Sequence, residues 1–431
     1  MSRNRDLAER FGTPLYVYDL DRVVASLLDL RKAVPAGATI FYSLKANPHP
    51  EIARTLREAP GAPCRAELSS VGELAAALEA GFKPEECLYT GPGKTTDEIA
   101  IAISRGVRTF SIESLNDLRR AGAVATKAGV SIDCLLRINS LASAASGSIR
   151  MMGARSQFGI DSETLPSELS EFRSVPGTRL VGGHFYSLSN SKDEASLSAE
   201  LRRSIADAAR LHAEFDLPMR LLDIGGGFAA PYAVPGERPR YNGLRVALEA
   251  ALDEHFPCWR AGMPEIALES GRYLVGDCGE LVTSVVNVKE SRGQIFAIVD
   301  AGINILGGMA GLGRLMPVGI KPDIPEPPDG TRPVTLVGPL CTPGDVLARS
   351  VQLSPPEPGD VLTVPNVGAY GLTASLVLFL GRPAACEVVV RGEEVAAVSQ
   401  LELRRLPRRD WDVPPARTGD VMRRTSLSAR A

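Results

Sequence analysis

Short apolar runs alternate with helix-patterned segments from about residue 20 to residue 275. Branched and aromatic side chains dominate the runs, which is typical of buried strands. Between the runs, segments such as 72–81, 114–129 and 198–215 carry Ala, Leu, Arg and Glu at helical spacing. Eight strand–helix units in roughly 250 residues predict a (β/α)8 barrel, with a doubly wound open sheet as the alternative. The expected strands are Thr39–Leu44, Cys64–Leu68, Cys87–Thr90, Arg108–Ile112, Ile132–Ile138, Leu180–Phe185, Arg220–Ile224 and Glu265–Glu269.

After residue 275 the pattern changes to strands with almost no helix between them. These strands lie in the segments 280–290, 294–302, 332–340, 345–351, 360–368 and 386–400. Within the last segment, RGEE at 391–394 predicts a hairpin turn. This second part of the chain is therefore expected to be an all-β domain.

The pattern divides the chain into four parts. PLYVYD at 14–19 is an extra strand ahead of the barrel, so residues 1–20 are expected to join the β domain. The barrel spans 21–275 and the β domain 276–407, with an irregular Gly- and Pro-rich loop at 303–331. The tail at 408–431 lacks core-forming periodicity, and we expect it to be disordered.

Composition narrows the function classes. The chain of 431 residues is 44% hydrophobic and has a net charge of −3 with both signs interspersed, which disfavours nucleic acid and membrane surfaces as partners. No apolar stretch reaches the ~18 residues of a membrane span, and the opening MSRNRDLAER lacks a signal-peptide core. Seven scattered cysteines without CxxC spacing and four histidines disfavour disulfides and a metal site. A cytoplasmic location is expected.

Polar residues and glycines stand where the expected barrel strands end. The active site of such a barrel lies at the carboxyl ends of its strands, so these residues are expected to gather at one rim. They are Lys45, Glu67, Arg137, His184, Gly225–Gly227, Glu269 and, just beyond, Arg272. Any one of them could be a solvated loop residue, but six strand ends of this kind favour a functional site.

Two of these features and one further motif have specific chemical interpretations. Lys45 is either a surface lysine or one desolvated at the barrel mouth, with a lowered pKa suited to covalent attachment of a carbonyl. The triple glycine of DIGGGF exposes backbone N–H groups that could cradle a phosphate, although a glycine run alone is a weak signal. TGPGKT at 90–95 imitates a phosphate-binding P-loop, but the motif requires Gly where Leu88 stands, so we reject it.

An ordered series of motifs over residues 10–400 resembles the fold-type III pyridoxal-phosphate (PLP) enzymes, the group of diaminopimelate and ornithine decarboxylases. The motifs are FYSLKANPHP, AELSSVGEL, TGPGKT, SQFGID, GGHFYSLSN, DIGGGF, ESGRYLVGDCGEL, DAGIN, GPLCTPGDVL and NVGAYGLTAS. The resemblance implies a barrel plus a C-terminal β domain, as in alanine racemase and ornithine decarboxylase. It also implies PLP as cofactor and a homodimer with shared active sites.

The resemblance assigns roles to individual residues. Lys45 resembles the lysine that carries PLP covalently, His184 the histidine stacked on the cofactor, and Glu269 the carboxylate paired with the pyridine nitrogen. Cys341 resembles a thiol that a neighbouring subunit contributes. The phosphate group is expected near Ser187, Gly225, Gly226, Gly227, Gly271, Arg272 and Tyr370, and further rim positions of the pocket are Glu67 and Arg137.

These roles agree with the chemistry of decarboxylation. PLP withdraws electrons effectively only while its ring nitrogen is protonated, and an anionic Glu269 favours that state. A thiol at Cys341 can return a proton to Cα after CO₂ is lost. The alternatives are a small buried hydrophobe for Cys341, a satisfied core histidine for His184 and a packing aromatic for Tyr370.

The clearest departure from the family follows Cys341. Diaminopimelate and ornithine decarboxylases place an acidic residue there, which binds the distal ammonium of the substrate, whereas this chain has the neutral Thr342. Thr342 could instead merely shape a turn, with Asp345 recognising a basic end. Together with SQFGID and CTPGD, the departure resembles relatives in antibiotic pathways that act on aminoacyl groups tethered to a carrier protein.

Four functions are compatible with the motifs and the resemblance. The preferred one is α-decarboxylation of an amino acid, with the substrate tethered to an acyl or peptidyl carrier protein. A diaminopimelate or basic-amino-acid decarboxylase is the alternative. A racemase is disfavoured, because the racemases place Arg opposite the pyridine nitrogen where this chain has Glu269. A PLP-binding homologue without activity is the last possibility.

Overall fold

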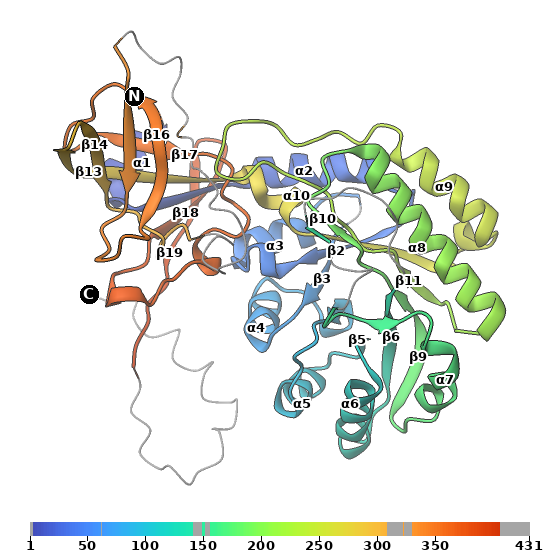
Figure 1. Cartoon of the computed structure of the whole chain (residues 1–431). Helices are drawn as coiled ribbons and strands as arrows, with labels where there is room; N and C mark the ends of the chain where they lie inside the picture. The colour runs from blue at the N-terminus through green and yellow to red at the C-terminus, as the bar shows by residue number, and fades with distance from the viewer. Residues whose placement is uncertain are drawn as a thin grey trace. The chain divides into compact units, whose positions relative to one another are not determined.

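Eight parallel strands close into a barrel, and each is followed by a helix on the outside (Figure 1). The computed structural model describes residues 3–61, 63–140, 149–150, 156–307, 322 and 330–405. In barrel order the strands are β2 (Thr39–Ser43), β3 (Arg65–Leu68), β4 (Cys87–Tyr89), β5 (Thr109–Ile112), β6 (Ile132–Asn139), β9 (Thr178–His184), β11 (Leu221–Asp223) and β12 (Glu265–Ser270), and β12 pairs with β2. The predicted barrel is confirmed, and the open sheet is excluded.

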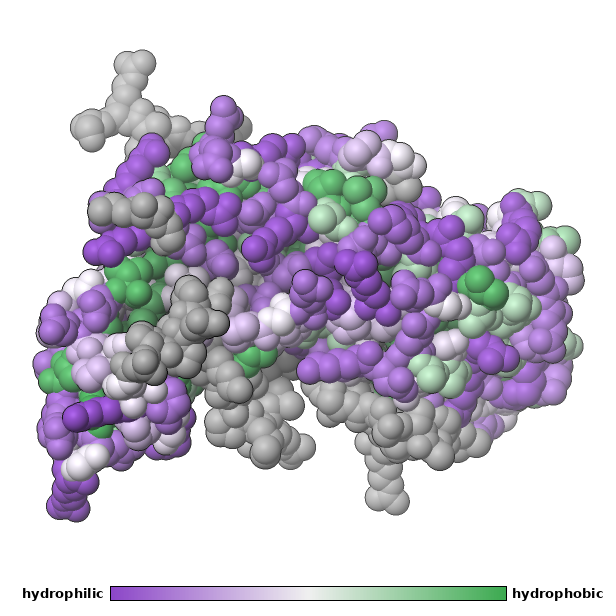
Figure 2. Space-filling model, turned by 90° about the horizontal axis from the view of Figure 1, so that it is seen from above, coloured by the Kyte–Doolittle hydropathy of each residue, from purple (hydrophilic) through white to green (hydrophobic). Residues whose placement is uncertain are grey.

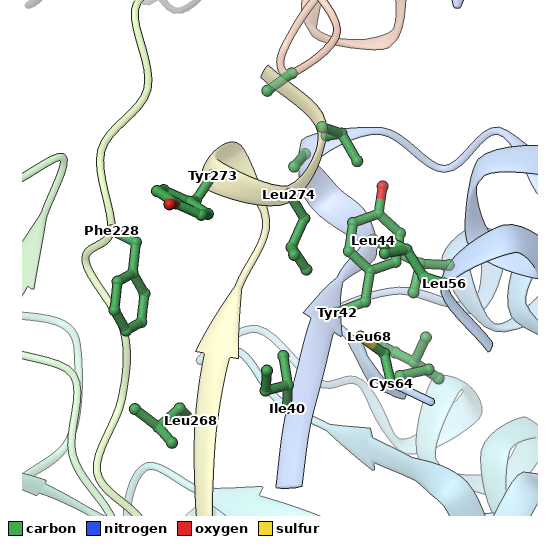
Figure 3. Close-up of a cluster of buried hydrophobic side chains, with 14 of the residues drawn as sticks. Ile40, Tyr42, Leu44, Leu56, Cys64, Leu68, Phe228, Leu268, Tyr273 and Leu274 are labelled. Atoms are coloured by element: carbon green, nitrogen blue, oxygen red, sulfur yellow. The ribbon is translucent and has the colours of Figure 1, made fainter. Parts of the chain in front are cut away.

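The outer helices cover the barrel strands. They are α2 (Leu20–Ala33), α3 (Pro50–Arg57), α4 (Val71–Glu79), α5 (Thr96–Ser104), α6 (Leu115–Lys127), α7 (Leu165–Arg173), α8 (Glu194–Phe215), α9 (Leu244–His255) and α10 (Arg272–Val275). Neighbouring side chains of β2 face opposite sides: Ile40 and Tyr42 pack against the helix layer, as Figure 3 shows, while Phe41 joins a separate cluster with Leu88 and Leu135. Because both faces are covered, apolar side chains point to both sides of these strands rather than alternating with polar ones.

A second sheet contains both the first strand of the chain and the last. Its strands are β1 (Leu15–Asp19), β13 (Gly279–Ser291), β14 (Gln294–Val299), β15 (Arg332–Val337), β16 (Val346–Leu353), β17 (Val361–Val364), β18 (Cys386–Arg391) and β19 (Glu394–Gln400). β1 lies between β13 and β18, antiparallel to the first and parallel to the second. The hairpin between β18 and β19 turns at Gly392 and Glu393, within the predicted RGEE.

The structure adds one helix that the sequence pattern did not predict. Helix α1 (Arg3–Phe11) precedes β1, and its Leu7 packs in a small cluster with Leu15 and Val17. The described residues up to Leu401 form one compact unit. The expected tail from residue 408 and most of the expected loop at 303–331 lie outside the described residues.

The segment imitating a P-loop starts a helix. Thr95 and Glu98 form a reciprocal capping box at the start of α5. The Nζ atom of Lys94 lies 2.8 Å from the carboxylate of Asp117 and also donates to the carbonyl of Ser111, and both charged side chains are buried. Lys94 is thus engaged within the protein, which agrees with rejecting the phosphate loop.

The surface shown in Figure 2 is mainly hydrophilic, with hydrophobic residues in small separate patches. Among the described residues, no helix combines the length and apolar character needed to cross a membrane.

Glu387 on β18 provides a test of the buried polar contacts in the second sheet. Its side chain is buried, it accepts a hydrogen bond of 3.1 Å from the hydroxyl of Tyr18, and burial raises its pKa to about 7. Between about pH 4.5 and 7 the unfolded chain therefore releases this proton while the folded protein keeps it, so the free energy of unfolding should fall as pH rises. Glu387→Gln should remove that part of the fall in urea unfolding.

The matched control is Glu290→Gln, which changes an exposed glutamate of the same sheet. It should keep the wild-type dependence of the free energy of unfolding on pH. An unchanged profile for Glu387→Gln would show that Glu387 ionises alike in both states.

Candidate active site

The register of the barrel strands places the predicted site residues side by side. Arg137 on β6 is opposite His184 on β9, which is in turn opposite Asp223 on β11. Glu67 is opposite Ser43, just before Lys45, and Glu269 ends the neighbouring strand β12. The carboxyl ends of parallel strands meet at one end of a barrel, so these side chains share one rim.

Lys45 forms an ion pair across this rim. Lys45 lies in a short 3₁₀ helix, Leu44–Ala46, directly after β2. Its Nζ atom is 3.2 Å from both carboxylate oxygens of Glu67. Partial removal from water lowers the pKa of Lys45, but the negative charges of Glu67 and Glu269 outweigh this and raise it above its usual value. The predicted lowering of its pKa is therefore wrong: the strand ends that desolvate Lys45 also supply two carboxylates.

A buried group of three ionisable side chains lies at the rim. It consists of His184, Glu269 and Asp223, none of which is more than 2% exposed. The Nε2 atom of His184 lies 3.0 Å from Oε1 of Glu269, while Nδ1 contacts the hydroxyl of Ser111 at 2.7 Å. The imidazole holds the pKa of Glu269 at about 2 despite its burial, and Glu269 raises the pKa of His184 despite burial of the ring. The pair is thus most stable as carboxylate and imidazolium.

Arg137 is held beside this group by a buried ion pair. Its Nη1 atom donates to Oε1 of Glu113 at 2.9 Å. Its guanidinium also lies over the rings of Phe158 and Tyr186, with 4.8 and 5.9 Å to their centroids. Glu113 additionally accepts the amide N–H of Gly159, so it fixes both Arg137 and the chain before β8 (Ile160–Asp161).

The triple glycine passes too close to its neighbours for side chains. A Cβ on Gly226 would lie 2.1 Å from the carbonyl oxygen of Glu269, and one on Gly225 would lie 2.2 Å from that of Phe185. Gly225 and Gly227 also have φ angles of +85° and +106°, which favour glycine. Ser187 follows β9 and is half-buried. The turn therefore leaves bare backbone next to Glu269.

Tyr370 lies in the segment between β17 and β18 of the second sheet and contacts the turn that contains Lys45. Its amide donates to the carbonyl of Ala46 at 2.7 Å, and its ring lies under the guanidinium of Arg272, 4.7 Å from centroid to Cζ. Gly271, just before Arg272, would place a Cβ 2.8 Å from that of Ala46. Lys45, Gly271, Arg272 and Tyr370 are thus brought together.

Cys341 and Thr342 are not part of this group. They lie in the loop between β15 and β16, where Cys341 is exposed and no contact among the described residues joins it to the rim. The hydroxyl of Thr342 accepts the amide N–H of Gly344 at 3.3 Å. Asp345 is buried, and its two oxygens accept the amide N–H groups of Ile303 and Leu340, both at 2.8 Å. Asp345 is thus occupied within the turn.

Sequence reasoning missed several polar residues at the same rim. Asp223 stands beside His184, Ser111 and Glu113 end or follow β5, and Thr90 donates to Oε1 of Glu67 at 2.6 Å. Each could have been found by the signal that identified the others, since each is a polar residue at or just after the end of a barrel strand. Their hydrogen-bond and ion-pair partners come from other strands, so their contacts at the rim become visible only in the folded structure.

Comparisons with known proteins identify the family of this chain. The family description "Pyridoxal-dependent decarboxylase, pyridoxal binding domain" matches residues 20–276. This chain belongs to the pyridoxal-dependent decarboxylases. It is 32% identical over 394 residues to the L-glutamyl–BtrI acyl-carrier protein decarboxylase of Niallia circulans, covering 89% of this chain and 90% of that one.

Two further relatives are diaminopimelate decarboxylases. That of Methanothermobacter thermautotrophicus is 32% identical over 403 residues, covering 92% of this chain and 91% of the relative. The crystal structure of the Helicobacter pylori enzyme complexed with L-lysine has a TM-score of 0.77 at 26% identity, covering 92% and 95% of the two chains. This pyridoxal-dependent decarboxylase is therefore a PLP-dependent carboxy-lyase acting on an amino acid.

The residues of the rim fit PLP. Oε1 of Glu269 and Nε2 of His184 lie 3.0 Å apart without hydrogen-bond geometry, and neither has another hydrogen-bond partner among the described residues, so both atoms are available to a ligand. Bare backbone at Gly225–Gly227 can approach a phosphate, and Lys45, whose side chain is 40% exposed, remains accessible. His184, Asp223 and Glu269 are also the single group of metal-type donors among the described residues, and they stand at the same rim.

Lys45 is predicted to be the attachment point of PLP in this decarboxylase. Borohydride reduction of the holoenzyme followed by peptide mass spectrometry should find the cofactor on Lys45 alone, because it is the lysine of the rim. Lys32→Ala changes an exposed lysine and should be labelled like the wild type. A stable label at one site in Lys45→Ala would contradict the assignment.

Proposed function

We propose that this enzyme removes the free α-carboxylate from an amino acid whose distal, side-chain carboxyl group is joined as a thioester to an acyl or peptidyl carrier protein. The observation that carries the proposal is the state of the loop after Cys341. Thr342 is neutral, and the carboxylate of Asp345 is buried against two backbone N–H groups. Residues 338–345 therefore offer no available carboxylate for a distal ammonium. The Niallia circulans relative, whose name specifies a carrier-bound glutamyl group, supports the same substrate class.

The rim residues supply binding and charge for this reaction. Bound PLP provides the electron sink for the electron pair left by CO₂. Lys45 would hold the cofactor covalently, and Glu269, whose pKa is about 2, stays anionic at the position assigned to the ring nitrogen. Gly225–Gly227, Gly271, Arg272, Ser187 and Tyr370 would surround its phosphate. Glu67 neutralises Lys45 before loading.

Cys341 would return a proton to Cα, and this requires a second copy of the chain. Its thiol is exposed and makes no contact with the rim of its own chain among the described residues. A homodimer in which each loop 338–345 enters the partner's site would bring the thiol to the substrate.

A cleft beside Lys45 favours a second candidate, decarboxylation of free diaminopimelate or another basic amino acid. The cleft has a volume of about 700 Å³, and its charged lining comprises Lys45, Glu51, Glu73, Glu79 and Glu387. Acidic walls suit an ammonium group, and the Methanothermobacter relative is a diaminopimelate decarboxylase. This candidate places recognition of the distal ammonium in the cleft instead of the loop after Cys341.

Thr342→Glu separates the two candidates. The wild type should have a much higher kcat/KM for an aminoacyl-carrier protein than for free diaminopimelate, lysine or ornithine. A carboxylate at 342 adds a charge-assisted hydrogen bond worth about 1.5–3 kcal/mol, so kcat/KM for the free diamino acids should rise roughly 10- to 150-fold. Thr342→Gln introduces a side chain of the same shape as glutamate but without the charge, and it should not show this gain in kcat/KM. Efficient wild-type turnover of free diaminopimelate would overturn the proposal and favour the second candidate.

The shared site is tested by mixing two inactive variants. Lys45→Ala and Cys341→Ala each damage one part of the site, so a mixed dimer contains one intact site. After subunit exchange, about a quarter of the wild-type activity should return if exchange is random. Exchange demonstrated by native mass spectrometry with no recovery of activity would contradict a thiol supplied by the partner.

A further inference from the structure

Asp223 is a buried carboxylate that the roles above leave unused. It ends β11, its exposed fraction is 0%, and the register places it directly beside His184. Oδ1 accepts the amide N–H of Gly225 at 2.9 Å, whereas Oδ2 has no hydrogen-bond partner among the described residues. Polar atoms of Asp223, His184 and Glu269 all lie within 4.8 Å of one another. A second carboxylate therefore lies beside the one assigned to the ring nitrogen.

Two carboxylates in such a space repel each other unless positive charge lies between them. Burial and the neighbouring Glu269 raise the pKa of Asp223 to about 7, while His184 and the N–H of Gly225 act in the opposite direction. The negative charge of Glu67 raises the pKa of Asp223 further by a smaller amount, and the cations Lys45 and Arg137 lower the pKa of Glu269. When Asp223 is ionised, the two carboxylates and the imidazolium together carry one net negative charge, which a protonated ligand nitrogen would offset.

We propose that Asp223 is a positioning residue of the cofactor site, which acts through His184 and Glu269 to hold a proton on the bound pyridine nitrogen. A local role is the alternative, in which Asp223 only fixes the DIGGGF turn through Gly225. The two roles use different properties of the side chain, because the turn needs an acceptor at Oδ1 and the proton needs the negative charge. The proposal does not depend on the identity of the substrate or on a carrier protein.

Asp223→Asn separates the two roles, since an amide keeps the acceptor for Gly225 but lacks the charge. The probe is 4′-deoxypyridoxine 5′-phosphate, which has no aldehyde and cannot bond to Lys45, bound to the apoprotein. Its ultraviolet absorption against pH reports the protonation of its ring nitrogen without any turnover. Asp223→Asn should lower the pKa of that nitrogen by about one unit or more, and weaken binding of the probe about tenfold at pH 8.

Two further variants complete the experiment. Asp223→Glu retains the charge and should recover part of the shift, whereas Glu290→Gln removes an exposed carboxylate of the second sheet and should leave the ring-nitrogen pKa unchanged. If Asp223→Asn binds the probe and titrates like the wild type, Asp223 is a turn residue and the proposal is wrong.

A measurement on the wild type covers the case in which the variants fail to fold. In protein labelled with ¹³C at the aspartate carboxyl carbon, binding of the protonated probe should lower the pKa of Asp223, because the coupling between two sites is reciprocal. A pKa of Asp223 that is the same with and without the probe would overturn the proposal.

Discussion

The ionised carboxylate of Glu269, buried at the end of β12 against the imidazole of His184, is the interaction on which the site depends. An isolated charge in such a place would take up a proton to become neutral. Here the imidazolium at 3.0 Å, with Lys45 and Arg137 further out, keeps the pKa of Glu269 at about 2. This explains why the rim carries so many charges: each buried one needs neighbours of the opposite sign. The same arrangement suits a ligand with a protonated ring nitrogen.

The second sheet contributes to this site through short-range contacts of its loops. The side chain of Asn47, two residues after Lys45, donates to the carbonyl of Gly368 at 2.9 Å, and the amide of Tyr370 donates to Ala46. The hydroxyl of Tyr232 in turn donates to the carbonyl of Tyr370. These bonds fix the turn that carries Lys45 from the side opposite the barrel. The sheet therefore shapes the site within one chain, before any role of Cys341 in a partner's site.

The sequence was sufficient to predict the barrel and much of the rim, because both follow from local patterns. All eight barrel strands lie where apolar runs predicted them, and Lys45, Glu67, Arg137, His184 and Glu269 stand at or just after strand ends. The pKa and the burial of a side chain depend on partners from other strands, so the local sequence could not predict them. The raised pKa of Lys45 requires Glu67 and Glu269 nearby, and the burial of Asp345 requires the backbone of residues 303 and 340. Helix α1 was missed because, of its residues, only Leu7 is buried.

The most direct test of the account is the intact mass of an aminoacyl-carrier protein incubated with the holoenzyme in D₂O. Decarboxylation should remove about 44 Da of CO₂ and leave one deuterium bound to Cα, since the solvent-derived proton replaces the carboxylate. We expect both changes together on the carrier-bound group. Deuterium uptake at Cα without loss of CO₂ would instead show exchange or racemisation, and would contradict the account.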